Sequence, residues 1–224
     1  MTGRIILLRH GQTDSNVARL LDTRPPGAEL TELGRQQAAA AGTELAEYVE
    51  AQDGSLGRLQ KIVCSVALRA QQTAILAARS LAQEAGLGAH DVPVEVVSGI
   101  HEISAGQWEM SNSDAAHLQF RQALHGWLHA AEDARMPGGE DFRDVVNRYQ
   151  PVLEEIARGL GDDEDVIVVS HGAAIRVMTT HAAGVEPEYA LENYISNCTF
   201  TVLEPRGKKF GQWTVSRWVG EDLA

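Results

Sequence analysis

Two segments far apart in the chain share a pattern that restricts the fold more than any other feature. Residues 5–8 and 166–169 consist only of Ile, Leu and Val, and His10 and His171 each follow one of these runs two residues later, with a glycine directly behind. Continuous apolar runs of this length are typical of strands buried on both faces of a parallel sheet. The carboxyl ends of such strands form a ligand-binding edge. The pattern therefore predicts that the two histidines meet at that edge.

The rest of the chain alternates predicted strands with predicted helices. Further strands are predicted at residues 62–64 and 92–97, and a terminal hairpin at residues 199–203 and 212–218. Helices are predicted at residues 31–50, with Thr31 as N-cap, and at residues 68–85, 113–131, 141–159 and 172–183. The connections are long enough for crossovers, which predicts an α/β fold: a three-layer sandwich with a largely parallel central sheet flanked by helices.

Length and composition predict one folded unit. A chain of 224 residues with 44% hydrophobic and 22% charged residues can bury a full core, so we predict a single domain over residues 1–224, with residues 104–140 as a candidate small helical cap. The apolar run at residues 5–8 is too short for a secretion signal or a membrane span, which favours a cytoplasmic protein without membrane partners. Cys64 and Cys198 lie in apolar contexts without Cys-x-x-Cys spacing, which favours buried, reduced thiols.

The charge balance argues against nucleic acid as a partner and limits anion binding to a local site. The formal net charge is -12, from 31 acidic and 19 basic residues, and no run of Lys and Arg interrupts the sequence. A polyanion is repelled by such a field, so nucleic acid is excluded as a partner. A small anion can still bind where arginines and backbone amides outweigh the global charge locally.

The first polar strand end has the composition of a phosphate site. Arg9, His10 and Gly11 follow the first apolar run, and Asn16 lies within reach downstream. A guanidinium group can hold two phosphate oxygens at once, and a glycine lets backbone N–H groups approach them. In isolation, a histidine after a strand is more often a polar core residue with satisfied hydrogen bonds. The other motifs of the chain decide between the two interpretations.

Five motifs follow one another along the chain. They are Arg-His-Gly at 9–11 with Asn16, Thr-Glu-Leu-Gly at 31–34, Ser65 with Leu-Arg-Ala-Gln-Gln-Thr-Ala at 68–74, His-Glu at 101–102 with Gly-Gln-Trp-Glu at 106–109, and Ser-His-Gly at 170–172. In this order they resemble the signature of the histidine phosphatase superfamily, also called the phosphoglycerate mutase-like family. The resemblance covers residues 5 to about 204, and one motif alone would be weak support.

The resemblance implies a role for each polar residue of these motifs. His10 would be the nucleophile that attacks phosphorus, and Glu102 would protonate the leaving group and later deprotonate water. Arg9, Arg69, Asn16 and His171 would hold the phosphoryl oxygens. The substrate is further expected to contact Gly11, Thr23 and Gly172. No metal and no cofactor are required, because arginine and imidazole groups supply the positive charge.

Other interpretations of these residues stay open on sequence alone. Glu95 and Glu109 are alternatives to Glu102 as the acid, and Arg69 could be a surface helix residue in an ion pair. His125 and His129 are spaced i, i+4 on a predicted helix and could bind a metal, but the sequence shows no third ligand. A solvated helix face is therefore the favoured interpretation of this pair.

The chain departs from the family pattern around the substrate. Residues 21–29, which include Thr23, replace a shorter glycine-containing segment of many members, Met110 stands where a glycine is expected, and Gly139-Glu140-Asp141 stands for Gly-Glu-Ser. These departures leave the phosphate-binding motifs intact and leave the substrate's identity open. The loop at residues 21–29 is expected to set selectivity.

Three functions fit this set of residues. The first is a phosphatase that hydrolyses a small phosphorylated metabolite, and the second is a phosphoglycerate mutase that uses the same pocket. Only about 35 residues separate Glu102 from Gly138, too few for the long enclosing insertion of cofactor-dependent mutases, which favours the phosphatase. The third, a phosphate-binding module without turnover, would need neither a nucleophile nor a proton donor. A homodimer is a candidate assembly.

Overall fold

A mixed β-sheet forms the centre of the computed structural model, which describes residues 2–219 and 221–222. Within these residues the sheet has seven strands in the order β3-β2-β4-β1-β5-β6-β7. The strands are β1 (Arg4–Arg9), β2 (Leu59–Ser65), β3 (Val94–Val97), β4 (Asp165–Ser170), β5 (Phe200–Glu204), β6 (Thr214–Trp218) and β7 (Glu221–Asp222). The pairs β3-β2, β2-β4 and β4-β1 are parallel, whereas β5, β6 and β7 pair antiparallel.

The register of the two central strands brings the polar strand ends together. In the parallel pair of β1 and β4, Leu8 lies opposite Val169 and Arg9 lies opposite Ser170. The residue directly after each strand is a histidine, and the His10 N–H donates to the Ser170 carbonyl at 3.0 Å. The predicted meeting of His10 and His171 at one edge of the sheet therefore follows from strand pairing.

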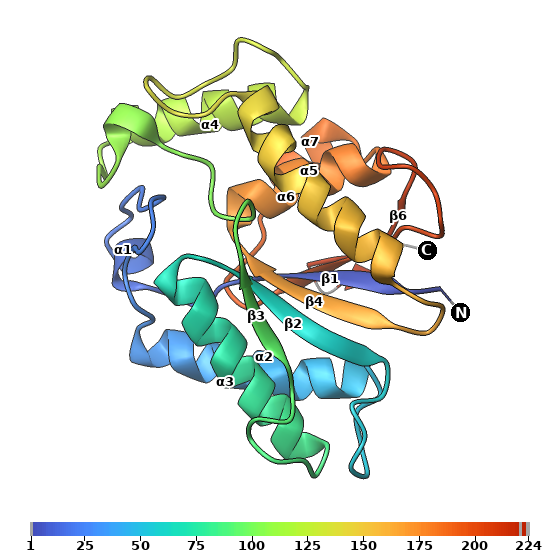
Figure 1. Ribbon diagram of the computed structural model, residues 1–224. Coiled ribbons are helices and arrows are strands. Elements are labelled where there is room, and N and C mark those ends of the chain that lie inside the picture. The colour runs from blue at the N-terminus through green and yellow to red at the C-terminus, as the bar shows by residue number, and fades with distance from the viewer. Residues whose placement is uncertain (1, 220, 223–224) are drawn as a thin grey trace.

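Helices cover both faces of the sheet (Figure 1). Helices α2 (Glu32–Tyr48) and α3 (Leu68–Glu84) lie against one face, and α4 (Asp114–Leu128), α5 (Phe142–Gly159), α6 (Gly172–Ala183) and α7 (Pro187–Glu192) lie on the other side. Side chains of β1 alternate between the two layers: Ile6 and Leu8 pack in the core of α2 and α3, and Ile5 and Leu7 in the second core. This arrangement confirms the three-layer α/β sandwich with a largely parallel sheet.

Helix caps and buried thiols agree with the sequence. Thr31 caps α2, because its hydroxyl oxygen accepts from the Gly34 N–H at 2.9 Å. Cys64 and Cys198 are buried and not joined in a disulfide. No helix formed by the described part of the chain is long and apolar enough to cross a membrane.

Four short elements were not predicted from the sequence. They are α1 (Asp14–Val17), the 3-10 turn η1 (Gly106–Trp108), α7 and β7. Each is too short for its hydrophobic period to be recognised in a window of ordinary length. The short helices α1 and α7 still matter for the site, because residues beside them line its pocket.

Candidate active site

A pocket of about 670 Å³ opens at the carboxyl ends of β1 and β4. Helix α4 contributes His117, Phe120, Arg121 and Leu124 to its wall. Of the residues singled out in the sequence, seven line this pocket: Arg9, His10, Asn16, Thr23, Arg69, Glu102 and Gly172. Gly11 and His171 do not line it, and both are buried directly behind the lining residues.

The environment of His10 keeps its ring neutral and fixes its tautomer. Nδ1 lies 2.7 Å from the Gly11 carbonyl oxygen, so this nitrogen carries the proton and donates it. Nε2 lies 3.2 Å from Nε of Arg69, whose N–H donates to the free lone pair. Burial, followed by the nearby charges of Arg69 and Arg9, holds the pKa of His10 well below its usual value. The result is an uncharged imidazole with an available Nε2 lone pair.

His171 is the second imidazole of the site. Its ring centroid lies 5.1 Å from that of His10, and Nε2 lies 2.9 Å from the Ser65 hydroxyl oxygen. Burial, together with the charge of Arg69, also holds the pKa of His171 well below its usual value. Within the described residues Nδ1 has no hydrogen-bond partner although it is buried. An unpaired buried ring nitrogen is costly, so Nδ1 of His171 has a hydrogen bond left to form.

Two arginines flank these rings. Arg9 Nη1 donates to the Ile195 carbonyl at 2.6 Å and to the Tyr194 hydroxyl, and its guanidinium carbon lies 5.0 Å from the centre of the Tyr194 ring. Arg69 is almost fully buried, and burial lowers its pKa although the Asp22 carboxylate, 3.9 Å from Nη1, opposes that shift. The interpretation of Arg69 as a surface residue is therefore wrong.

Glu102 lies at the amino end of α6. Its two carboxylate oxygens accept from the N–H groups of Ala173 at 3.1 Å and Ala174 at 3.0 Å. The alternatives lie elsewhere: Glu95 pairs with Lys61 at 2.8 Å on the outer strands, and Glu109 accepts from the Thr23 N–H at 2.7 Å. Glu102 alone among the three carboxylates considered lines the pocket.

Asn16 and Thr23, both in the pocket wall, differ in how many of their side-chain hydrogen bonds are already made. The side-chain oxygen of Asn16 accepts from the Thr13 N–H at 3.1 Å and from Nδ2 of Asn197 at 3.2 Å, which leaves its own amide N–H groups for a ligand. The Thr23 hydroxyl donates to Glu109 at 2.5 Å and accepts from the Ala105 N–H at 3.0 Å. Thr23 therefore joins the 21–29 loop to the segment after Glu102.

The glycines of the two His-Gly pairs have different surroundings. The Gly11 N–H donates to the Thr73 hydroxyl at 3.0 Å, and a Cβ atom here would lie 2.5 Å from the Gly34 carbonyl oxygen. Gly11 is thus needed for close packing against the start of α2. A Cβ on Gly172 would lie 3.1 Å from Nε of Arg9, so Gly172 leaves room for that guanidinium group.

Comparison with known proteins gives the family. The sequence profile of the histidine phosphatase superfamily (branch 1) matches residues 5–219, nearly the whole chain. The protein is a member of the histidine phosphatase superfamily. The five motifs that resembled this superfamily are therefore confirmed as its signature in this chain.

Relatives of this histidine phosphatase superfamily member include a mutase and phosphatases. It is 33% identical over 178 residues to the 2,3-bisphosphoglycerate-dependent phosphoglycerate mutase of Rhizobium etli, covering 79% of this chain and 77% of that protein. It is 30% identical over 191 residues to the glucosyl-3-phosphoglycerate phosphatase of Mycolicibacterium vanbaalenii, covering 81% and 75%. A solved mycobacterial glucosyl-3-phosphoglycerate phosphatase matches with a TM-score of 0.72 at 26% identity, covering 97% of this chain and 99% of that one.

Sequence reasoning missed an arginine in the pocket of this histidine phosphatase. Arg176 lies on α6 one turn after Gly172, is buried, and lines the pocket together with Arg9. Its spacing of four residues from Gly172 places both on one helix face, which was a detectable pattern. Tyr194 also lines the pocket and contacts both guanidinium groups, but the segment after α7 gave no pattern that predicted it.

A partly buried ion pair holds the loop that carries Glu102. Arg148 Nη1 donates to the carbonyls of Gly99 at 2.6 Å and His101 at 2.8 Å, and its Nε lies 2.6 Å from Glu140. The Arg148 guanidinium lowers the pKa of Glu140, opposing the effect of burial. Glu140, in turn, accepts from the Ser104 N–H at 2.9 Å. The pair fixes both ends of the short loop from residue 99 to residue 104.

Proposed function

We propose that this protein is a phosphatase that hydrolyses small phosphomonoesters through a phosphohistidine on His10. The observation that carries the proposal is the neutral imidazole of His10, whose Nδ1 is held by the Gly11 carbonyl at 2.7 Å while Nε2 accepts from Arg69 in the same pocket as Glu102. A nucleophile, two cations and a carboxylate in one pocket match the needs of phosphoryl transfer.

The first half-reaction forms the phosphoenzyme. The phosphate group of the substrate binds between Arg9 and Arg69, and Arg69 exchanges its bond to Nε2 for a bond to a phosphate oxygen. Nε2 of His10 then attacks phosphorus while the ester bond breaks on the opposite side. Glu102, in its protonated form, gives its proton to the leaving alkoxide. The unpartnered Nδ1 of His171 supports a role for this ring as a donor to an oxygen of the phosphoryl group.

The second half-reaction restores the enzyme. Glu102, now a carboxylate, takes a proton from a water molecule as this water attacks phosphorus. The bond between phosphorus and Nε2 breaks, its electron pair returns to His10, and inorganic phosphate leaves. The guanidinium groups of Arg9 and Arg69 carry the positive charge in this scheme, and the neutral ring of His171 adds a hydrogen-bond donor, so the proposed phosphoryl transfer needs no metal. Residues 104–140, whose helix α4 lines the pocket, serve as a cap within a single domain.

The pocket also favours a substrate with a second anionic group. Arg19, Arg121 and Arg176 line it in addition to the two arginines at the phosphate site. A guanidinium group can form a bidentate pair with a carboxylate as well as with a phosphate. The relatives named after phosphoglycerate and glucosyl-3-phosphoglycerate support this substrate class, because both names denote phosphate monoesters that also carry a carboxylate.

Product analysis separates phosphatase from mutase. The mutase is the second candidate, because the Rhizobium etli relative carries that name at 33% identity. A panel of phosphorylated carboxylic acids, including 3-phosphoglycerate with and without 2,3-bisphosphoglycerate, is assayed both for inorganic phosphate and for isomerised product. We expect phosphate release to exceed isomerisation and to persist in EDTA. Fast isomerisation with little phosphate release would instead make the mutase the function.

A further inference from the structure

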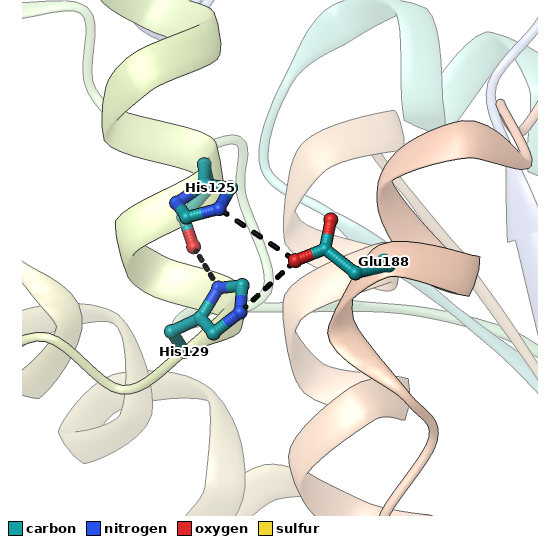
Figure 2. Close-up of side chains that lie close together, drawn as sticks. All are labelled: His125, His129 and Glu188. Atoms are coloured by element: carbon teal, nitrogen blue, oxygen red, sulfur yellow. Dashed lines mark hydrogen bonds and ion pairs between the residues drawn. The ribbon is translucent and has the colours of Figure 1, made fainter.

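Three potential metal ligands meet on the surface beside the cap (Figure 2). His125 lies in the last turn of α4, His129 is the C-cap residue of that helix, and Glu188 approaches both from α7. Their ligand atoms all lie within 4.8 Å of one another. The side chains are 53%, 38% and 63% exposed respectively, and none of them lines the pocket. Glu188 is the third ligand that the sequence alone did not reveal, because it belongs to a different helix.

The distances match the edges of a small coordination polyhedron. Nε2 of His129 lies 3.3 Å from Oε1 of Glu188, and Nε2 of His125 lies 3.7 Å from the same oxygen. Zinc binds nitrogen and oxygen at about 2.0–2.2 Å, so two ligands of a tetrahedral site are about 3.3–3.5 Å apart. One small dication can therefore bind all three atoms with little movement of the side chains.

The ring orientation of His129 favours metal binding. Nδ1 of His129 lies 2.8 Å from the His125 carbonyl oxygen and donates to it, so Nε2 faces Glu188. The two rings stack with centroids 4.2 Å apart and an interplanar angle of 27°. Nε2 of each ring lies near Oε1 of Glu188, so a single dication can contact both rings and the carboxylate.

From this geometry we propose that His125, His129 and Glu188 bind one divalent transition-metal ion of the zinc type. The three side chains supply two imidazole nitrogens and one carboxylate oxygen, and water fills the remaining position. The bond from His129 Nδ1 to a backbone carbonyl is the outer contact that orients a metal-binding imidazole.

The bound ion joins two walls of the pocket. Helix α4 carries Phe120 and Leu124 in the pocket wall, and α7 leads into Tyr194 and Ile195, which both accept from Arg9. A metal bridge between the helices therefore limits the movement of the cap relative to the segment that holds Arg9. Because none of the three ligands lines the pocket, this site does not depend on the proposed phosphatase chemistry.

Zinc titration of the untagged, chelator-treated protein tests the proposal. Zinc is added in the presence of a competing chromophoric chelator, and thermal unfolding is followed with and without one equivalent of zinc. We expect one saturable site per chain and a higher midpoint of unfolding with zinc. His129→Ala and Glu188→Gln should each weaken binding by at least about tenfold and remove the shift of the midpoint.

Two control variants make the outcome specific. Glu192→Gln removes another exposed carboxylate of α7, one turn beyond Glu188, and His90→Ala removes an exposed histidine of a loop; both should bind zinc like the wild type. Circular dichroism verifies that each variant is folded. The proposal is overturned if the wild-type protein shows no saturable site at micromolar zinc, or if the double variant His125→Ala/His129→Ala binds as tightly as the wild type.

Discussion

The imidazole of His171 lies against that of His10, with ring centroids 5.1 Å apart and an interplanar angle of 59°. Burial, followed by the positive charge of Arg69, lowers the pKa of both rings, and a charge on His10 adds to the lowering of the pKa of His171. Both rings are therefore neutral at physiological pH. In a protein with a formal net charge of -12, this cluster provides a local site where an anion can bind next to an uncharged imidazole.

Replacing His10 removes the proposed nucleophile. We expect His10→Ala to lower kcat for phosphate release by at least about a thousandfold, because neither Arg69 nor His171 can form the covalent intermediate in its place. Rapid quenching of the wild type with substrate should trap an acid-labile phosphohistidine that is absent from the variant. His90→Ala, which changes an exposed loop histidine, is the matched control and should retain full activity. Turnover by His10→Ala at wild-type rates would remove the mechanism.

The neutral histidines make stability depend on pH. Both have a folded pKa well below the ordinary value of 6.5, so between these values the unfolded chain binds more protons than the folded one. Their contribution is complete above pH 6.5 and is lost as the pH falls below it, by about 1.4 kcal/mol per pH unit for each ring. Chemical denaturation at intervals from pH 7.5 to pH 5.5 should show this fall.

A variant identifies the source of that pH dependence. His171→Asn cannot be protonated in this range, so its stability should fall less steeply than that of the wild type below pH 6.5. Carboxylates with a lowered pKa, such as Glu140, lose their contribution only below their ordinary value of 4.5, outside this window. An equal slope in the variant and the wild type would show that His171 does not take part.

Glu102→Gln separates proton transfer from helix capping. The amide oxygen of glutamine can still accept from one of the two N–H groups, of Ala173 or Ala174, that the carboxylate oxygens bind, so the start of α6 should largely be retained. An amide cannot donate a proton to the leaving group, and kcat for an alkyl phosphate should fall by about 10²–10⁴. With p-nitrophenyl phosphate the leaving group needs no proton, so we expect a rapid burst of nitrophenol followed by slow turnover. If the burst were lost, Glu102 would have a role other than proton transfer.

The central strands and the start of α2 could be predicted because short stretches of sequence define them. The apolar runs that become β1 and β4 define buried strands by themselves, and parallel pairing then brings His10 and His171 to one edge. Thr31 could be recognised as the cap of α2 because its partner, Gly34, is three residues away. Each of these features depends on residue type and spacing along the chain.

The remaining features depend on contacts between elements that are far apart in the sequence. No local sequence pattern predicts these contacts. Glu188 approaches His125 and His129 because α7 packs beside α4, and α7 is too short to be predicted from hydrophobic spacing. The Thr23 hydroxyl donates to Glu109, which lies 86 residues further along the chain. Such pairings arise only after the sheet and its helices are assembled.

Arg148 acts on the site through the position of Glu102. We expect Arg148→Met to lower kcat by about tenfold or more, because the carbonyls of Gly99 and His101 lose their donor and the loop can move. Stability should fall by about 1–3 kcal/mol, since Glu140 loses its charged partner and the backbone carbonyls lose their donor. Adding Glu140→Gln should restore part of the stability but not kcat. Arg143→Met, which breaks an exposed pair with Glu132, is the control and should leave both quantities within error of the wild type.

The contact between Gly11 and Gly34 should tolerate no added methyl group. A Cβ on Gly34 would lie 2.0 Å from the Gln12 carbonyl oxygen, and a Cβ on Gly11 would lie 2.5 Å from the Gly34 carbonyl oxygen. Both obstacles are backbone atoms, so only a shift of the turn after β1 can relieve them. That turn also holds Nδ1 of His10 through the Gly11 carbonyl. The packing of two backbones and the orientation of the nucleophile are therefore coupled.

Gly34→Ala tests this coupling, and Gly159→Ala, at another helix glycine, is the control. We expect the free energy of unfolding to fall by about 1–3 kcal/mol and kcat to fall with it, because Nε2 of His10 moves away from its line of attack. Gly159 lies at the exposed end of α5 with no atom within 4 Å of an added Cβ. Gly159→Ala should thus be neutral or stabilise by up to about 1 kcal/mol. If Gly34→Ala matched Gly159→Ala in stability and kcat, close packing of the turn on α2 would not control the position of His10.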